Sequence, residues 1–89
     1  MTENEIQKGE EIGKITHFFS KIGVAVVELT GNLKTGDTIV IAGRGREFEQ
    51  PVDSMQVEHE AVAVAKPGDA VGLKVAQVVK PGDAVYLKG

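Results

Sequence analysis

The sequence contains no cysteine, no tryptophan and only two histidines among its 89 residues. A disulfide framework is therefore excluded, and too few soft ligands remain for a structural zinc site. A chain of this length can still form one domain with a modest core. Because 42% of the residues are hydrophobic and 26% are charged, the composition is typical of a soluble globular protein that packed apolar side chains stabilise.

Long hydrophobic runs are also missing from the sequence. No apolar stretch approaches the roughly 20 residues that a membrane-spanning helix needs. The first residues, MTENEIQKGEE, are acidic, whereas a secretory signal begins with basic residues followed by an apolar segment. We therefore expect a cytoplasmic protein with no membrane partner.

An excess of basic residues is absent as well, since ten lysines and arginines face thirteen acids and give a net charge of −3. Residues 1–11 carry four glutamates and one lysine, which leaves nine acids and nine bases from Ile12 onward. We expect residues 1–11 to be a mobile acidic arm and residues 12–89 to be a single domain. A neutral domain lacks the positive surface on which nonspecific nucleic-acid binding depends, so strong autonomous RNA binding is not expected.

Turn-forming residues are abundant, with eleven glycines and three prolines, and the segments between them have the β-branched composition of short strands. The expected strands cover residues 12–19, 22–29, 38–43 and 47–58, with one more strand after each of the turns at Pro67 and Pro81. Alternation in the first strand predicts that Ile15, His17 and Phe19 share one face. The second strand is apolar on both faces and is therefore expected to be well buried.

The strand predicted at residues 47–58 changes phase along its length. Its apolar residues fall on even numbers up to Val52 and on odd numbers from Met55. A half-buried strand changes phase in this way only at a bulge, which we place at residues 53–54. Pro51 has no N–H group to donate to a ladder, which favours an edge or a bend.

The last third of the sequence contains a repeat, in which Lys-Pro-Gly-Asp-Ala-Val at residues 66–71 recurs at residues 80–85. Proline presets φ at the second turn position and glycine accepts a positive φ at the third, so each copy predicts a type II turn that starts a strand. Lys-Thr-Gly-Asp at residues 34–37 is a weaker third copy. The aspartates of the three copies are predicted to bind nearby backbone N–H groups, which explains them without a functional site.

Short strands separated by regular turns predict an all-β fold. We expect a small six-stranded antiparallel barrel, closed or nearly closed, because closure removes exposed strand edges.

Three segments carry a resemblance to a known family: Ile-Gly-Lys-Ile at residues 12–15, Leu-Lys-Thr-Gly-Asp-Thr-Ile-Val-Ile at residues 33–41, and Lys-Pro-Gly-Asp-Ala-Val-Gly-Leu at residues 66–73. In this order and spacing they resemble the β-barrel that follows the GTP-binding domain in elongation factor Tu and its relatives. The resemblance covers residues 12–87. It implies a stand-alone barrel of the translation-protein type that binds RNA or a translation-related protein.

In that family the barrel helps to hold the 3′ end of aminoacyl-tRNA. The resemblance places Gln56 where the family has an acid, Glu58 where it has an aromatic residue and Lys66 where it has arginine. Loss of the aromatic ring removes a stacking surface, and lysine lacks the planar paired donors of arginine. Only the positive charge at Lys66 is retained, so we do not expect tRNA binding in the family's manner.

A second resemblance rests on Phe-Glu-Gln-Pro-Val at residues 48–52 and on the Lys-Pro-Gly-Asp turn at residues 80–83. Both segments resemble the C-terminal barrel of collagenase-like peptidases of bacteria and archaea, which is itself similar to the elongation-factor barrel. The two resemblances agree on architecture and differ in context. The second one implies an alternative function, an accessory protein-interaction barrel that docks on a larger enzyme.

Candidate catalytic groups are few. His17 is predicted on an apolar strand face and His59 in a solvated turn between two glutamates, and neither has a partner that would position it as a base or a metal ligand. The segment from Gly9 to Ile15 is one residue too short between its glycines for a phosphate-binding loop. We expect no enzyme activity, no metal, no nucleotide and no other cofactor, and a hydrolase that uses one of the histidines is the remaining alternative.

Arg44 and Arg46 flank a glycine at a predicted hairpin tip, where guanidinium groups can meet phosphate or an acidic partner without desolvating a core. Together with Lys66 they are the predicted contacts with RNA or with a partner protein. A solvated hairpin tip is the alternative interpretation of the two arginines.

Overall fold

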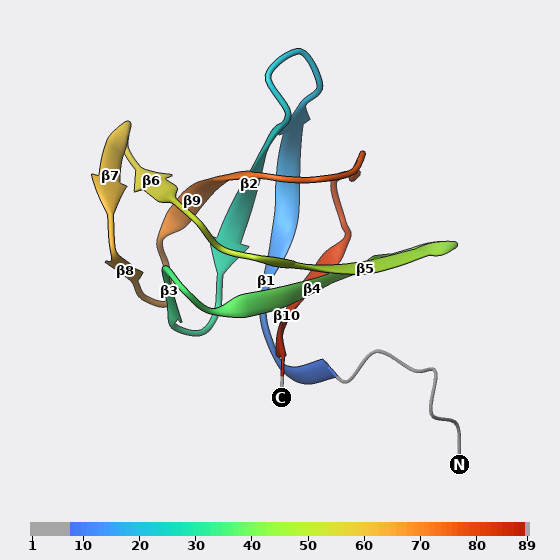
Figure 1. The fold of residues 1–89 in the computed structure, drawn as a ribbon, viewed down its shortest axis with the longest axis horizontal. Helices are drawn as coiled ribbons and strands as arrows, with labels where there is room; N and C mark the ends of the chain where they lie inside the picture. The colour runs from blue at the N-terminus through green and yellow to red at the C-terminus, as the bar shows by residue number, and fades with distance from the viewer. Residues whose placement is uncertain (1–7, 89) are drawn as a thin grey trace.

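The computed structural model describes residues 8–88, which form strands and turns without a helix (Figure 1). The strands are β1 (Lys8–Phe19), β2 (Val24–Leu29), β3 (Leu33–Lys34), β4 (Thr38–Gly43), β5 (Arg46–Pro51), β6 (Met55–Val57), β7 (Glu60–Val62), β8 (Val64–Ala65), β9 (Ala70–Lys74) and β10 (Ala84–Lys88). Nowhere in that range is there a helix long and apolar enough to cross a membrane. The predicted all-β class is confirmed.

The first strand begins earlier than the sequence pattern suggests. Residues 8–11 of the predicted acidic arm belong to β1, where Lys8 lies opposite Lys88 and Glu11 opposite Tyr86 of β10. Backbone pairing with β10 extends the strand through this polar stretch. The rest of the predicted arm, residues 1–7, lies outside the described residues.

Eight of the strands form one antiparallel sheet in the order β5-β4-β10-β1-β2-β9-β6-β7, and β3 and β8 form a separate pair. The larger sheet is strongly curved, but β5 and β7 remain its two edges (Figure 1). The prediction of a six-stranded barrel, closed or nearly closed, is therefore corrected to an open eight-stranded sheet with a separate two-stranded pair. The physical reason is that β5 pairs with β4 while the following strand, β6, pairs with β9 and β7, so no ladder joins β5 to β9.

The bulge predicted in the fourth strand is instead a break between β5 and β6, because residues 52–54 belong to no strand. Val52 turns away to bond the backbone of the turn before β4. Its N–H donates to the Asp37 carbonyl at 2.8 Å, and its carbonyl accepts from the Gly36 N–H at 2.9 Å. The phase therefore changes where the chain leaves the sheet, and Pro51 ends an edge strand as its missing N–H favours.

An irregularity that the sequence pattern did not predict lies in β1. The register of β1 against β2 slips between Ile15 and His17. This slip moves the alternation by one position, so Phe18 packs against the core while His17 and Phe19 are exposed. The prediction that Ile15, His17 and Phe19 share one face is therefore wrong.

The core consists almost entirely of aliphatic side chains drawn from most of the strands. Its members are Ile12, Ile15, Ala25, Val27, Leu29, Leu33, Ile39, Ile41, Phe48, Val52, Met55, Ala65, Val71, Leu73, Val79 and Val85. Strand β2 supplies alternate residues from Ala25 to Leu29, as a strand with one inward face must. Its other face is only partly covered, because Val24 and Val26 are half-buried. The prediction that both faces of this strand are well buried is corrected accordingly.

The three Lys-x-Gly-Asp segments fold into the same turn. In each, the aspartate N–H donates to the lysine carbonyl and the lysine N–H donates to the aspartate Oδ2, at 3.0–3.1 Å. The glycines Gly36, Gly68 and Gly82 have φ of 94°, 94° and 98°. Each turn is also bonded to one buried residue elsewhere in the chain. The carbonyl of that residue accepts from the glycine N–H, and its N–H donates to the aspartate carbonyl. The buried residues are Val52 for the turn at Gly36, Leu29 for the turn at Gly68 and Ile15 for the turn at Gly82. The predicted turns, and the structural role of their aspartates, are confirmed.

Candidate functional site

The residues predicted to contact RNA or a partner are not gathered at one place. Arg44 is exposed in the turn between β4 and β5, and Lys66 is exposed in the turn between β8 and β9. Figure 1 shows these two turns on opposite sides of the molecule. Arg46 is the first residue of β5, and its side chain lies outside the described part of the structure. The described cations of this set therefore form no common surface.

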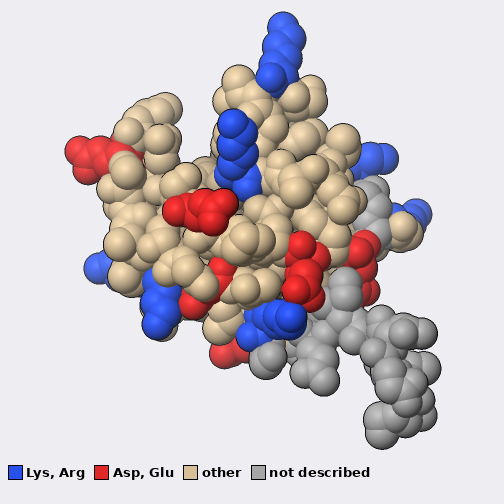
Figure 2. Space-filling model, in the orientation of Figure 1, with Lys and Arg blue, Asp and Glu red and all other residues tan. Residues whose placement is uncertain are grey.

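Charges of both signs are mixed over the surface in view. In Figure 2 the lysines and arginines stand apart from one another, with acidic groups between several of them. Among the described residues no group of three or more histidines, cysteines and acids is placed to hold a metal ion. Electrostatics alone therefore does not single out a site on this face.

The two histidines lie at the surface, close to apolar side chains. His17 is exposed, and its ring stacks on that of Phe19 with a centroid separation of 6.3 Å and an interplanar angle of 24°. His59 is exposed in the turn between β6 and β7. The predicted positions of the two histidines are thus corrected in one respect: His17 faces outward, away from the core that Ile15 enters, because of the register slip in β1.

An apolar surface runs across the outer face of β1, β2 and β9. The register places Phe19 opposite Val24, and it places Val26 opposite Gly72 of β9. Phe19 is 51% exposed and Ile22, in the turn between β1 and β2, is 62% exposed. Large apolar side chains this exposed and this close together mark interaction sites more often than single ones do.

A groove of about 300 Å³ is formed on this face. It is lined by Phe19, Ile22, Val24, Val26, Gln56, Glu58, His59, Ala70 and Gly72. In Figure 1 the β1–β2 hairpin rises at the top and the β6–β7 hairpin stands at the upper left, with β9 between them. We refer to this feature as the outer groove.

One wall of the outer groove is a turn with an unusual backbone. Glu58 and His59, which connect β6 to β7, have φ of 52° and 68°. Two consecutive positive φ values define the two-residue hairpin turn for which Asn-Gly is the preferred sequence, because other side chains are strained there. Each such non-glycine residue costs on the order of 1 kcal/mol or more, and strained residues of this kind cluster at functional sites.

The sequence pattern contains two signals for this site. Apolar residues on both faces of residues 22–29 predict burial of both faces, whereas one of them is only partly covered. The acidic residues around His59 predict a solvated turn; the turn is exposed, and it also borders an apolar groove. The exposed face and the position of the turn both depend on which strands lie side by side. A local sequence pattern does not specify the order of the strands.

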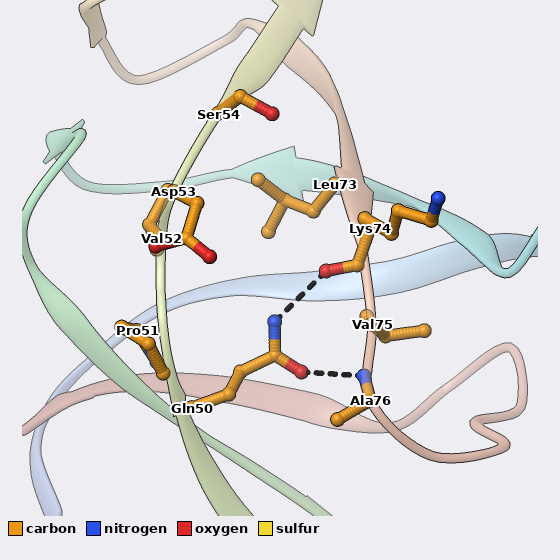
Figure 3. Close-up of a pocket in the computed structure, with 9 residues that line it drawn as sticks. All are labelled: Gln50, Pro51, Val52, Asp53, Ser54, Leu73, Lys74, Val75 and Ala76. Carbon is orange, nitrogen blue, oxygen red and sulfur yellow. Dashed lines mark hydrogen bonds between the residues drawn. The ribbon is translucent and has the colours of Figure 1, made fainter.

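A second cleft lies where β5 and β9 separate. It has a volume of about 290 Å³ and is lined by residues 50–54 and 73–76. Figure 3 shows the Gln50 side chain crossing this gap, with Leu73 and the Asp53 carboxylate directed into it from opposite sides. The Gln50 Nε2 donates to the carbonyl of Lys74, the last residue of β9, and its Oε1 accepts from the N–H of Ala76 just beyond the strand. The cleft is therefore a seam of the fold that a side chain already spans.

Comparison with known proteins gives one curated relative and several structural neighbours. The chain is 46% identical over 78 residues to an uncharacterized protease of Methanocaldococcus jannaschii, a match that covers 86% of this chain and 19% of the protease. It therefore spans about a fifth of that relative's length. No protein-family model matches the sequence.

Two crystal structures superpose on nearly the whole fold. Both are of the C-terminal domain of a Geobacillus thermoleovorans protein assigned to the U32 peptidases, and one contains selenomethionine. Their TM-scores are 0.84 and 0.85 at 21% and 20% identity, and they cover 88% and 90% of this chain and 99% and 93% of the crystallised domains. The resemblance to the C-terminal barrel of collagenase-like peptidases is supported, whereas these similarities do not support the resemblance to elongation factor Tu.

Proposed function

We propose that this chain is a non-catalytic protein-interaction domain that docks on the body of a peptidase-like protein. The apolar outer face carries the proposal, since exposed Phe19 and Ile22 gain most from burial against another protein surface. The similarity to C-terminal domains of U32 peptidases supplies the context. The match to about a fifth of the protease's length is consistent with a small domain that acts together with a larger one.

The acidic residues of the turns support a non-catalytic role. The carboxylates of Asp37, Asp69 and Asp83 each accept a hydrogen bond from a backbone N–H at 3.0–3.1 Å. A carboxylate held in this way stabilises its own turn. These three side chains therefore serve the scaffold.

RNA binding through Arg44, Arg46 and Lys66 has less support. Arg44 and Lys66 occupy opposite sides of the molecule, so they cannot neutralise adjacent phosphates of one short strand. The docking function requires no such surface and uses the apolar face instead.

The test is a calorimetric titration of the 89-residue protein into the Methanocaldococcus jannaschii protease from which the matched segment has been deleted. We expect binding by the wild type. Ile22→Ser should weaken it by about tenfold or more, because an apolar side chain loses its burial. Val78→Ser is the matched control, since Val78 is 63% exposed but does not line the outer groove. Absence of binding by the wild type would overturn the proposal.

A further inference from the structure

Gly72 forms the floor of the outer groove, although its backbone conformation does not require glycine. The φ of Gly72 lies outside the left-handed region, and a Cβ placed there would meet Val24 Cγ1 at 3.7 Å and Gln56 O at 4.0 Å, which are ordinary contacts. An alanine would therefore fit. Glycine in the middle of a strand weakens the strand, and it marks places where another chain approaches closely. What Gly72 preserves is open space above the sheet.

The space above Gly72 has apolar sides. Val26 lies opposite Gly72 on β2, and Val24 and Phe19 continue the apolar row toward the β1–β2 turn. A volume of about 300 Å³ is at the lower end of the range of about 300–1,000 Å³ for ligand pockets, so it admits one or two side chains and not a broad surface.

The charge of the outer groove has one sign. Glu58 is the only acidic residue that lines it, and no lysine or arginine does so within the described part of the chain. Glu60 follows two residues later and is also exposed. The positive φ values at Glu58 and His59 hold this acidic turn at the edge of the apolar row. A cation on the partner is therefore complementary to this wall.

We propose that the outer groove binds an extended peptide segment whose apolar side chain sits over Gly72 and whose arginine or lysine, two positions away, faces Glu58. The inference rests on the proposed docking function, and it specifies which side chains of the partner protein enter the groove. Alternate residues of an extended segment point to the same side. An apolar residue and a basic residue two positions apart can therefore enter the groove together.

The probes are three blocked hexapeptides of glycine and serine that carry a Leu-Ser-Arg, a Leu-Ser-Glu or a Ser-Ser-Arg core. Binding is followed by amide chemical shifts of the ¹⁵N-labelled 89-residue protein. We expect the Leu-Ser-Arg peptide to shift residues 19–26, 56–59 and 70–72. Loss of leucine should weaken binding by about tenfold. Exchange of arginine for glutamate should weaken it by up to about fivefold, the effect of an exposed charge pair.

Two variants separate the two halves of the proposal. Glu58→Gln should remove the difference between the Arg and Glu peptides while the leucine preference remains. Gly72→Leu should fill the groove and weaken all binding by about tenfold or more, whereas Gly72→Ala is the control that adds one methyl group. Thermal unfolding of each variant checks that the fold is retained.

The inference is overturned if the shifts fall elsewhere, if Gly72→Leu binds like wild type, or if the same residues shift with protein concentration alone, which would show a second copy in the groove. Failure here differs from failure of the docking function. If the truncated protease binds wild type and Gly72→Leu equally, docking stands and the groove inference falls. If the peptides bind the groove while the truncated protease does not bind, the groove inference stands and docking on a peptidase falls.

Discussion

Gln50 on the edge strand β5 is hydrogen-bonded to Lys74 at the end of β9, its Nε2 donating to the Lys74 carbonyl at 2.8 Å. The Oε1 atom of the same amide accepts from the Ala76 N–H, also at 2.8 Å. One side chain thus provides the donor and acceptor that a strand ladder would supply between β5 and β9 (Figure 3). The Gln50 amide thus hydrogen-bonds the two sides of this seam.

Replacing Gln50 by alanine should therefore destabilise the domain. Two hydrogen bonds at an exposed site are worth about 1–2 kcal/mol in the free energy of unfolding. Urea denaturation of Gln50→Ala measures this loss. Gln77→Ala, in the exposed loop after β9, is the control and should change the free energy of unfolding by less than about 0.5 kcal/mol. Equal values for the two variants would show that the amide does not hold the seam.

The three turn aspartates should differ in their contribution to stability although their geometry is the same. Asp83 is buried, with 6% of its surface exposed, whereas Asp37 and Asp69 are half-buried. Removing a carboxylate leaves the lysine N–H of the turn without its acceptor, and water can replace that acceptor more easily at the half-buried turns. We expect Asp83→Ala to cost about 2–3 kcal/mol and the other two about 1 kcal/mol each.

Chemical denaturation of the three aspartate variants checks this order. Asp53→Ala is a suitable control, because Asp53 is exposed and belongs to none of the three turns. If Asp37→Ala is as damaging as Asp83→Ala, burial is not what separates the turns.

Gly13 of β1 and Gly72 of β9 should respond in opposite ways to alanine. A Cβ at Gly13 would lie 2.8 Å from both Glu28 O and Val27 Cγ1, so β1 and β2 would have to move apart. We expect Gly13→Ala to destabilise by about 1–3 kcal/mol, as overpacking does. Gly72→Ala should be neutral or stabilising by up to about 1 kcal/mol, since it only reduces the freedom of the unfolded chain. Thermal unfolding measures the stability of both variants relative to wild type. Equal effects of the two substitutions would contradict the prediction.

Substitution of the turn residues Glu58 and His59 should stabilise the domain and weaken peptide binding. Changing the pair to Asn-Gly supplies the residues that two positive φ values favour, and we expect a gain of about 1–2 kcal/mol in the free energy of unfolding. The same double variant should bind the Leu-Ser-Arg peptide more weakly, because the carboxylate is removed. Glu58→Gln is the control, since it removes the charge and leaves the turn equally strained. A double variant that is no more stable than wild type would show that the native turn is unstrained.

Local chemistry explains the parts of the fold that the sequence predicted correctly. A Lys-x-Gly-Asp segment contains its own bond acceptor and the residue that tolerates positive φ, so the turns at Gly68 and Gly82 form wherever they are placed. The edge position of Pro51 follows in the same way from its missing N–H. Strand composition likewise identified the all-β class.

Placement of one segment against another explains what the sequence could not predict. The slip beside His17 and the departure of Val52 from the sheet depend on partners far away in the chain. The outer groove has the same origin, because Phe19 and Glu58 become neighbours of one hollow only when β9 lies between β2 and β6.

The amino-acid sequence alone specifies the turns and the alternation of most strands, since both depend on residues within a few positions of one another. It also specifies the neutral charge of the domain, which depends only on composition. Tertiary contacts are what leave the sheet open and one face of β2 only partly covered. The tertiary structure also separates the β4–β5 turn, which contains Arg44, from the β8–β9 turn, which contains Lys66. Strand pairing joins distant segments through backbone groups that every residue except proline carries, so side-chain patterns alone do not specify which edges meet.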